Sequence, residues 1–296
     1  IRPGNAVAID QLAITLKVSS DFTELSDHLA AAALCRETMA ALDRLSAEDR
    51  RDPNARAKRS SGLLNCGNNL RYSGDFVGAR RLLEEARDLR DDGWKEDPQN
   101  VLALRMRLDP YTYLLTVSSN SDRLRLHQIL EGIFDAVEVH YPSSDAPEFD
   151  RAVLRAAAAD LNFELGRRDE AIRLAGLAFP VLKRIALAPR ALAVMQATAA
   201  KALLDSKVPG FADPKLALAL AERANTRPDS TESVAMVTPA DVLAYPAVLA
   251  RAQWENGNPE GAIHAQERAV ALLANAAPVL LAEARKTLER YRGQKS

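Results

Sequence analysis

Three turn glycines recur along this chain at a nearly constant interval. Gly74, Gly166 and Gly257 each precede a polar residue, and they lie 92 and 91 residues apart. Turn-like sites at Asn120 and Ala212 stand half-way between them, so the sequence repeats about every 46 residues. A period of this length is typical of stacked helical hairpins, in which each unit contacts only its neighbours. The spacing therefore predicts an all-α repeat fold.

Small residues recur with the same period. Counting five and twelve residues beyond each turn position selects mostly alanine, and residues seven apart lie on one face of a helix, where small side chains let two backbones approach closely. The selected pairs are Ala33 and Ala40, Ala79 and Ala86, Arg125 and Gly132, Ala171 and Ala178, Ala217 and Ala224, and Ala262 and Ala269. We expect these positions to pack between helices. The third unit, which contains Arg125, matches the pattern least.

Capping residues mark the starts of the predicted helices. Asp213-Pro214 and Asn258-Pro259 each place a side-chain acceptor before a proline, which suits the first turn of a helix because proline has no amide hydrogen to satisfy. Asp52-Pro53 and Asp97-Pro98 open the second and third units in the same way. We predict one continuous domain over residues 1–296. Its hairpins are predicted at 5–46, 54–93, 99–140, 148–186, 189–226 and 238–275, with a solvent-facing capping helix at 278–292.

Three segments interrupt this regular pattern. Pro110 and Pro246 fall inside predicted first helices, where proline kinks or shortens a helix because it removes a backbone hydrogen bond. Residues 226–237 are rich in Ser, Thr and Asp and are predicted to form an extended loop.

Charge and motif content argue against several classes of function. The 39 Lys and Arg residues balance 40 Asp and Glu residues, so no positive field attracts nucleic acid or an anionic membrane surface. The apolar stretches are far shorter than the ~20 residues that cross a bilayer. The four histidines are scattered without metal-ligand spacing, and no phosphate-binding glycine loop or hydrolase elbow occurs. We therefore expect no metal, no cofactor and no catalysis.

Two cysteines, Cys35 and Cys66, fall on predicted helices. We interpret them as small buried apolar residues, with a disulfide or a metal site as the alternatives. They leave the compartment open: the cytoplasm is favoured, and the periplasm would suit a chain attached to a membrane-anchored protein. Because the chain begins at Ile1 and not at Met, we expect it to be a piece of a longer protein.

The order of residues in the second and sixth units resembles the tetratricopeptide repeat (TPR) family. Residues 63–67 (Leu-Leu-Asn-Cys-Gly) precede the turn at 73–76, and two alanines follow it; residues 250–254, the turn at 256–259 and two further alanines repeat this plan. The resemblance implies an α-solenoid of about six antiparallel hairpins wound into a right-handed superhelix. The chain departs from the family in its period, which is about 34 in the common repeat, and in placing Pro246 and Gln266 at positions that are aromatic there.

The same resemblance implies a concave groove that is lined by the first helix of each hairpin. Its predicted residues are Asn65, Asn68, Tyr72, Arg107, Tyr111, Asp160, Phe163, Arg251 and Glu255. Asn can both donate to and accept from a peptide backbone, and Arg can form two parallel hydrogen bonds with a carboxylate. The alternative is that these residues solvate an exposed face, or that Phe163 and Trp254 pack between repeats. Trp94 has the same two interpretations, as a partner anchor or as a junction residue.

The predicted function is therefore the non-catalytic binding of a peptide or a partner protein. An alternative is the sensory or regulatory region of a larger bacterial signalling enzyme such as a serine/threonine kinase, because residues 213–224 and 243–273 are similar in style to arrays attached to such proteins. A further alternative is self-association through an edge hairpin.

Overall fold

Helices make up every element of the chain that the structure, a computed structural model, describes. The described residues are 27–44, 52–140, 145–226, 239–274 and 278–294, together with scattered positions between 9 and 23. Within each compact unit most helices pack in adjacent pairs, so the predicted all-α fold of successive hairpins is confirmed. The chain divides into two compact units, residues 1–140 with 275–279 and residues 141–274 with 280–296.

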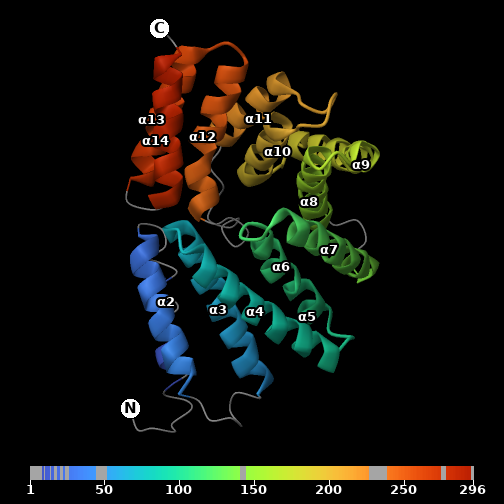
Figure 1. Ribbon diagram of the computed structural model, residues 1–296, viewed down its shortest axis with the longest axis vertical. Coiled ribbons are helices and arrows are strands. Elements are labelled where there is room, and N and C mark those ends of the chain that lie inside the picture. The colour runs from blue at the N-terminus through green and yellow to red at the C-terminus, as the bar shows by residue number, and fades with distance from the viewer. Residues whose placement is uncertain are drawn as a thin grey trace. The chain divides into compact units, whose positions relative to one another are not determined.

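The first unit contains the helices that are drawn from blue to green in Figure 1. They are α2 (His28–Leu42), α3 (Pro53–Ser73), α4 (Phe76–Glu96), α5 (Val101–Met106), α6 (Leu108–Leu115) and α7 (Asn120–His140). Helices α3 and α4 form a hairpin, α2 packs on α3, and α7 packs against both α5 and α6.

The second unit repeats the hairpin three times. Its helices are α8 (Asp145–Glu164), α9 (Arg168–Leu187), α10 (Ala193–Asp205), α11 (Pro214–Thr226), α12 (Pro239–Glu255), α13 (Pro259–Leu273) and α14 (Pro278–Gly293). Helices α8 and α9, α10 and α11, and α12 and α13 pair with one another, and α12 also packs on both α10 and α11 (Figure 1).

The turns and caps follow the predicted chemistry. Gly74, Gly166 and Gly257 have φ of 94°, 77° and 77°, the left-handed region that favours glycine. Asp213 accepts a hydrogen bond from the amide of Leu216 at 3.1 Å, and Asn258 accepts one from the amide of Gly261 at 3.0 Å. Asp52 caps α3 similarly. In the third predicted hairpin Asn100 caps the first helix in place of Asp97, because α5 begins only at Val101.

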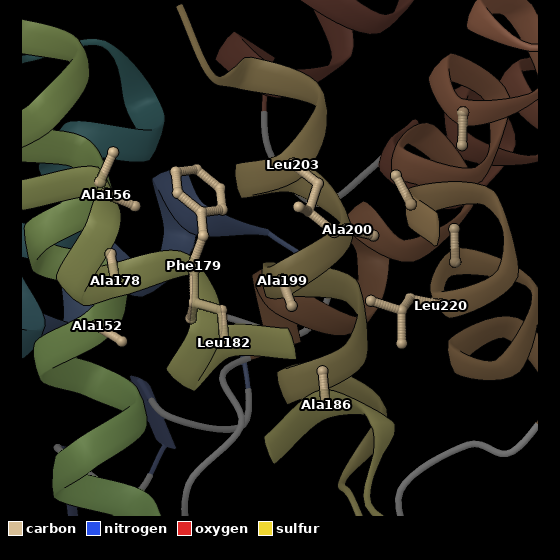
Figure 2. Close-up of a cluster of buried hydrophobic side chains, with 14 of the residues drawn as sticks. Ala152, Ala156, Ala178, Phe179, Leu182, Ala186, Ala199, Ala200, Leu203 and Leu220 are labelled. Carbon is tan, nitrogen blue, oxygen red and sulfur yellow. The ribbon is translucent and has the colours of Figure 1, made fainter. Parts of the chain in front are cut away.

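Alanine side chains lie between neighbouring helices of the second unit (Figure 2). Ala178 on α9 and Ala199 and Ala200 on α10 are fully buried. Leucines from the same helices, such as Leu182 and Leu203, fill the remaining space. Small residues at these points let neighbouring helices approach closely, while the leucines contribute most of the buried apolar area.

The alanines that were predicted to be buried are buried in four of the six predicted hairpins. These are Ala79 and Ala86, Ala171 and Ala178, Ala217 and Ala224, and Ala262 and Ala269. The prediction is wrong in the first and third hairpins, where four of these residues are exposed: Ala33, Ala40, Arg125 and Gly132.

A displaced starting point explains both errors. In α4, α9, α11 and α13 the buried pairs lie three and ten residues after the first residue of the helix. The turn positions for the first and third hairpins lie five residues before Ala33 and Arg125, at His28 and Asn120. These two residues are themselves the first helical residues, so counting from them overshoots by two. Counted from the helix start, the equivalent positions include Ala31 and Thr38 in α2 and Leu130 in α7, which are all buried.

The two prolines behave differently. The first helix of the third predicted hairpin is divided at Arg107 into α5 and α6, and Pro110 is the third residue of α6. Shorter helices were expected at this proline. Pro246 lies inside the continuous helix α12. The loop that was predicted at residues 226–237 falls, from residue 227 onward, outside the described residues.

The cysteines form a disulfide, so their interpretation as unpaired buried residues is wrong. Cys35 on α2 and Cys66 on α3 are bonded, with their Cα atoms 5.2 Å apart, a separation typical of disulfides. The corrected register explains the pairing, because Cys35 lies seven residues after the start of α2, at a buried position of the helix.

The last helix has the two faces expected of a cap. Ala284, Leu288 and Tyr291 are buried at helical spacing. The charged residues on its other face are all exposed, namely Glu283, Arg285, Lys286, Glu289 and Arg290. Gln266 is buried on α13 and donates a hydrogen bond from Nε2 to the carbonyl of Ala284 at 3.0 Å. Helix α14 therefore covers the apolar face of the preceding hairpin and presents charge to solvent.

Candidate partner-binding face

The first helices of the second unit end in charged side chains that lie one repeat apart. We call this set the charged row: Asp160 and Glu164 on α8, Asp205 at the end of α10, Lys207 just beyond it, and Arg251 and Glu255 on α12. Three of these residues, Asp160, Arg251 and Glu255, are among those predicted for the groove.

Helices α8 and α10 are joined through Lys207. Its backbone amide donates to Asp160 Oδ1 at 2.8 Å, and its ammonium group pairs with Glu164. Burial raises the pKa of Asp160, although the hydrogen bond from Lys207 opposes this rise. The hydrogen bond to Glu164 raises the pKa of Lys207. The half-buried Asp160 side chain therefore holds the segment that follows α10.

Helices α10 and α12 are joined through Arg251. One guanidinium nitrogen pairs with Asp205, and another donates to the carbonyl of Leu204 at 2.7 Å. Lys201 also pairs with Asp205. Burial alone would raise the pKa of Asp205, but the two cations outweigh it, and the pKa is lowered. Asp205 is thus compensated by two cations.

The aromatic residues of the same helices pack inward. Phe163 and Trp254 are partly buried against the core of the unit. The Trp254 ring stacks on Tyr291 of α14, with ring centroids 4.4 Å apart and planes 12° apart. These contacts favour the alternative interpretation, in which the two aromatic residues pack between repeats. Glu255 beside Trp254 is exposed.

In the first unit, three predicted residues lie on α3. Asn65 and Tyr72 are half-buried, whereas Asn68 is only 5% exposed and accepts a hydrogen bond from Arg71 at 2.7 Å. The Arg71 guanidinium carbon lies 4.1 Å from the centre of the Tyr72 ring, a cation–π distance. Asn65 and Tyr72 therefore offer more surface to a ligand than Asn68 does.

The remaining predicted residues, Arg107 and Tyr111, both contact Asp91 of α4. Arg107 Nε and the Tyr111 hydroxyl donate to its two carboxylate oxygens at 2.7 and 2.6 Å. Burial, together with the hydrogen bond to Asp91, raises the pKa of Tyr111 to about 12. Arg107 also stacks over the ring of Trp94 at 4.3 Å. These contacts favour the junction interpretation of Trp94 over the partner anchor.

Sequence reasoning missed four residues, although one signal identifies the first of them: Asp205, Lys207, Lys201 and Glu164. Asp205 and Arg251 have opposite charge and stand 46 residues apart, which is one repeat period. Residues one period apart lie on neighbouring first helices, so charges of opposite sign at that spacing predict an ion pair between hairpins.

Two kinds of feature are absent from the described residues. They contain no group of three or more His, Cys, Asp and Glu side chains placed to hold a metal ion. None of the helices in the described part of the chain combines the length and the apolar character that a bilayer crossing requires. Hydrogen bonding and ion pairing are what the charged row can provide.

The hairpins have glycine turns with positive φ and buried alanine pairs, two features that they share with the predicted repeat pattern. No protein-family model matches the chain, and no curated protein matches it either. Among solved structures it is similar to yeast Tom70, at 13% identity and a TM-score of 0.35, over 90% of this chain and 59% of that one. It is also similar to a tetratricopeptide repeat protein from Parabacteroides merdae, at 16% identity and a TM-score of 0.35, over 95% of this chain and 99% of that one. The chain thus spans less than two thirds of the Tom70 chain.

Proposed function

We propose that the chain is a non-catalytic scaffold that binds a peptide or a partner protein along the first helices of its hairpins. The observation that supports this most is the alignment of the ends of α8, α10 and α12, whose side chains contact one another one repeat apart. An extended ligand that crosses successive hairpins would meet equivalent positions at regular intervals. The charged row offers that ligand both carboxylates and cations.

Several members of this face have room to exchange an internal partner for a ligand. The side chains of Lys201 and Lys207 are 65% and 52% exposed, and Glu255 is exposed as well. Exposed ion pairs contribute only about 0–1 kcal/mol to stability. Replacing one of them by an ion pair with a ligand therefore costs little. On α3, Asn65 and Tyr72 are the corresponding candidates in the first unit.

The test begins with an affinity pull-down and mass spectrometry to identify a partner. Titration calorimetry then compares the parent with Glu255→Lys and Lys201→Glu, which reverse charges on the proposed face. Arg268→Glu is the matched control, because Arg268 is exposed on the second helix α13. We expect at least a tenfold loss of affinity for one of the two variants and none for the control. Equal affinity for all four proteins would remove this face from the proposal.

The second proposal is that the array regulates a larger bacterial signalling enzyme such as a serine/threonine kinase. Its support is the resemblance of residues 213–224 and 243–273 to arrays of that kind, and these residues fold as α11, α12 and α13. The full-length gene tests it, because a gene without a catalytic domain contradicts it. Self-association also stays a prediction, and light scattering that finds only monomer at high concentration would contradict it.

A further inference from the structure

The buried apolar face of helix α2 consists mostly of small side chains. Three of its residues are alanines, and only two are large: Ala31, Ala32, Ala41, Met39 and Leu42. Ala32 packs with Leu70 of α3. Farther along, Met39 and Leu42 lie over Gly62, where an added Cβ would be 3.3 Å from the Met39 sulfur. Glycine at this point lets the two helices approach closely, but it contributes no side chain to the interface. The apolar area that holds α2 is therefore modest, because it scales with side-chain size.

Polar contacts add little to this interface. Asp43, just after α2, pairs with Arg59 of α3 at 2.6 Å, and the Asp43 side chain is 56% exposed. Arg59 also pairs with Glu85 of α4 at 2.7 Å. An ion pair this exposed is weak because solvent screens it, and Arg59 keeps its second partner if α2 leaves.

The Cys35–Cys66 bond lies in the middle of this interface and closes a segment of 31 residues. A crosslink over that separation shifts the equilibrium toward the closed form by several hundred-fold, from the chain entropy that it removes. A factor of this size is comparable to what the burial of one or two large apolar side chains contributes, so the bond is a substantial part of what holds α2.

We propose that this disulfide is a redox-controlled device. The oxidised protein keeps α2 on α3, and reduction lets α2 detach while α3 to α7 stay folded. Detachment uncovers the strip of α3 that contains Gly62, Cys66 and Leu70, which are all buried when α2 is docked. The first unit thus presents this apolar strip in a reducing environment and covers it in an oxidising one.

The reaction needs a dithiol reductant and a transient opening of the interface. Both cysteines are 1% exposed, so the attacking thiolate reaches a sulfur only when α2 lifts from α3. The thiolate attacks one cysteine sulfur, the S–S bond breaks, and a mixed disulfide forms while the other cysteine leaves as a thiolate. The second thiol of the reductant then displaces the first cysteine. Two electrons pass to the protein, and the reductant leaves as a cyclic disulfide.

Hydrogen exchange with mass spectrometry on the full chain tests the proposal. The samples are the oxidised protein, the protein in excess dithiothreitol with reduction verified by alkylation, and Cys35→Ala with Cys66→Ala. We expect α2 amides to exchange several hundred-fold faster after reduction. The double variant should exchange fast with or without dithiothreitol. Helices α3, α4 and α9 are internal controls and should not change.

Three outcomes would overturn the proposal. The first is equal α2 exchange in the oxidised and reduced protein. The second is loosening of α3 and α4 together with α2, because the bond would then stabilise the whole unit. The third is a protein that alkylates at both cysteines without any reductant. If the double variant fails to fold, the reduced parent still decides the question, since its cysteines are unchanged.

Discussion

Acidification from pH 7 to pH 5 should destabilise the first unit through one side chain, His127. This residue lies on α7 and is 5% exposed. Neither ring nitrogen has a hydrogen-bond partner among the described residues. Burial, with a further contribution from Arg123, lowers the pKa of His127 from 6.5 to about 4. The folded unit therefore keeps the imidazole neutral at a pH where the unfolded chain protonates it.

The size of the effect follows from the two pKa values. Because the unfolded state binds the proton first, the stability contributed by neutral His127 is complete above pH 6.5 and is lost as the pH falls toward 4. At 1.36 kcal/mol for each pKa unit, the full loss is ~3.4 kcal/mol, and ~2 kcal/mol of it falls between pH 7 and pH 5. Carboxylates with lowered pKa, such as that of Asp122, lose their contribution at lower pH.

Urea unfolding at pH 7, 6 and 5 measures this loss. The chain has two tryptophans, so a Trp254→Phe background leaves Trp94 to report on the first unit by fluorescence. In that background, His127→Leu should abolish most of the pH dependence, because leucine at position 127 binds no proton. A variant with the same pH profile as its parent, or a parent whose stability is flat over this range, would refute the reasoning.

Three further predictions concern packing, turns and ion pairs, and thermal or urea unfolding checks each. Ala178→Leu should cost about 1–3 kcal/mol because the fully buried site has no room, whereas Ala33→Leu, at an exposed site, should be nearly neutral. Gly166→Ala should destabilise by about 1 kcal/mol because φ is 77° there. Gly176→Ala, in the exposed middle of α9, should instead stabilise by about 0.5–1 kcal/mol. The opposite order of stabilities would contradict the assignment of Gly166 to a turn. Arg251→Met should cost about 1 kcal/mol at low salt and less at high salt, and an effect that does not depend on salt would argue against the ion pair.

The interval of the repeat could be predicted from the sequence more securely than its phase. Glycines at Gly74, Gly166 and Gly257 fix the phase, because only glycine adopts their positive φ without strain. His28 and Asn120 are ordinary helix starts, and nothing in their chemistry distinguishes a turn residue from the first helical residue. The predicted buried positions were therefore displaced by two in those units.

The partners of polar groups could be predicted less well than the positions of apolar ones. His127 and Gln266 both stand seven residues after the start of a second helix, a buried position that apolar side chains occupy in α4, α9 and α11. Only the three-dimensional contact shows that Gln266 reaches a carbonyl of α14. The disulfide was missed for the same reason, since the pairing of Cys35 with Cys66 depends on the register of α2 against α3.

The contacts between first helices restrict how such a chain can change its length during evolution. Lys207 reaches back to Asp160, and Arg251 reaches back to Asp205, so the second and third hairpins of the second unit are each matched to the one before. An inserted or deleted residue within α10 rotates the following side chains by about 100° on the helix and misaligns the junctions on both sides. Duplication of a complete hairpin recreates both junctions unchanged, so growth by whole units is the route that this architecture tolerates.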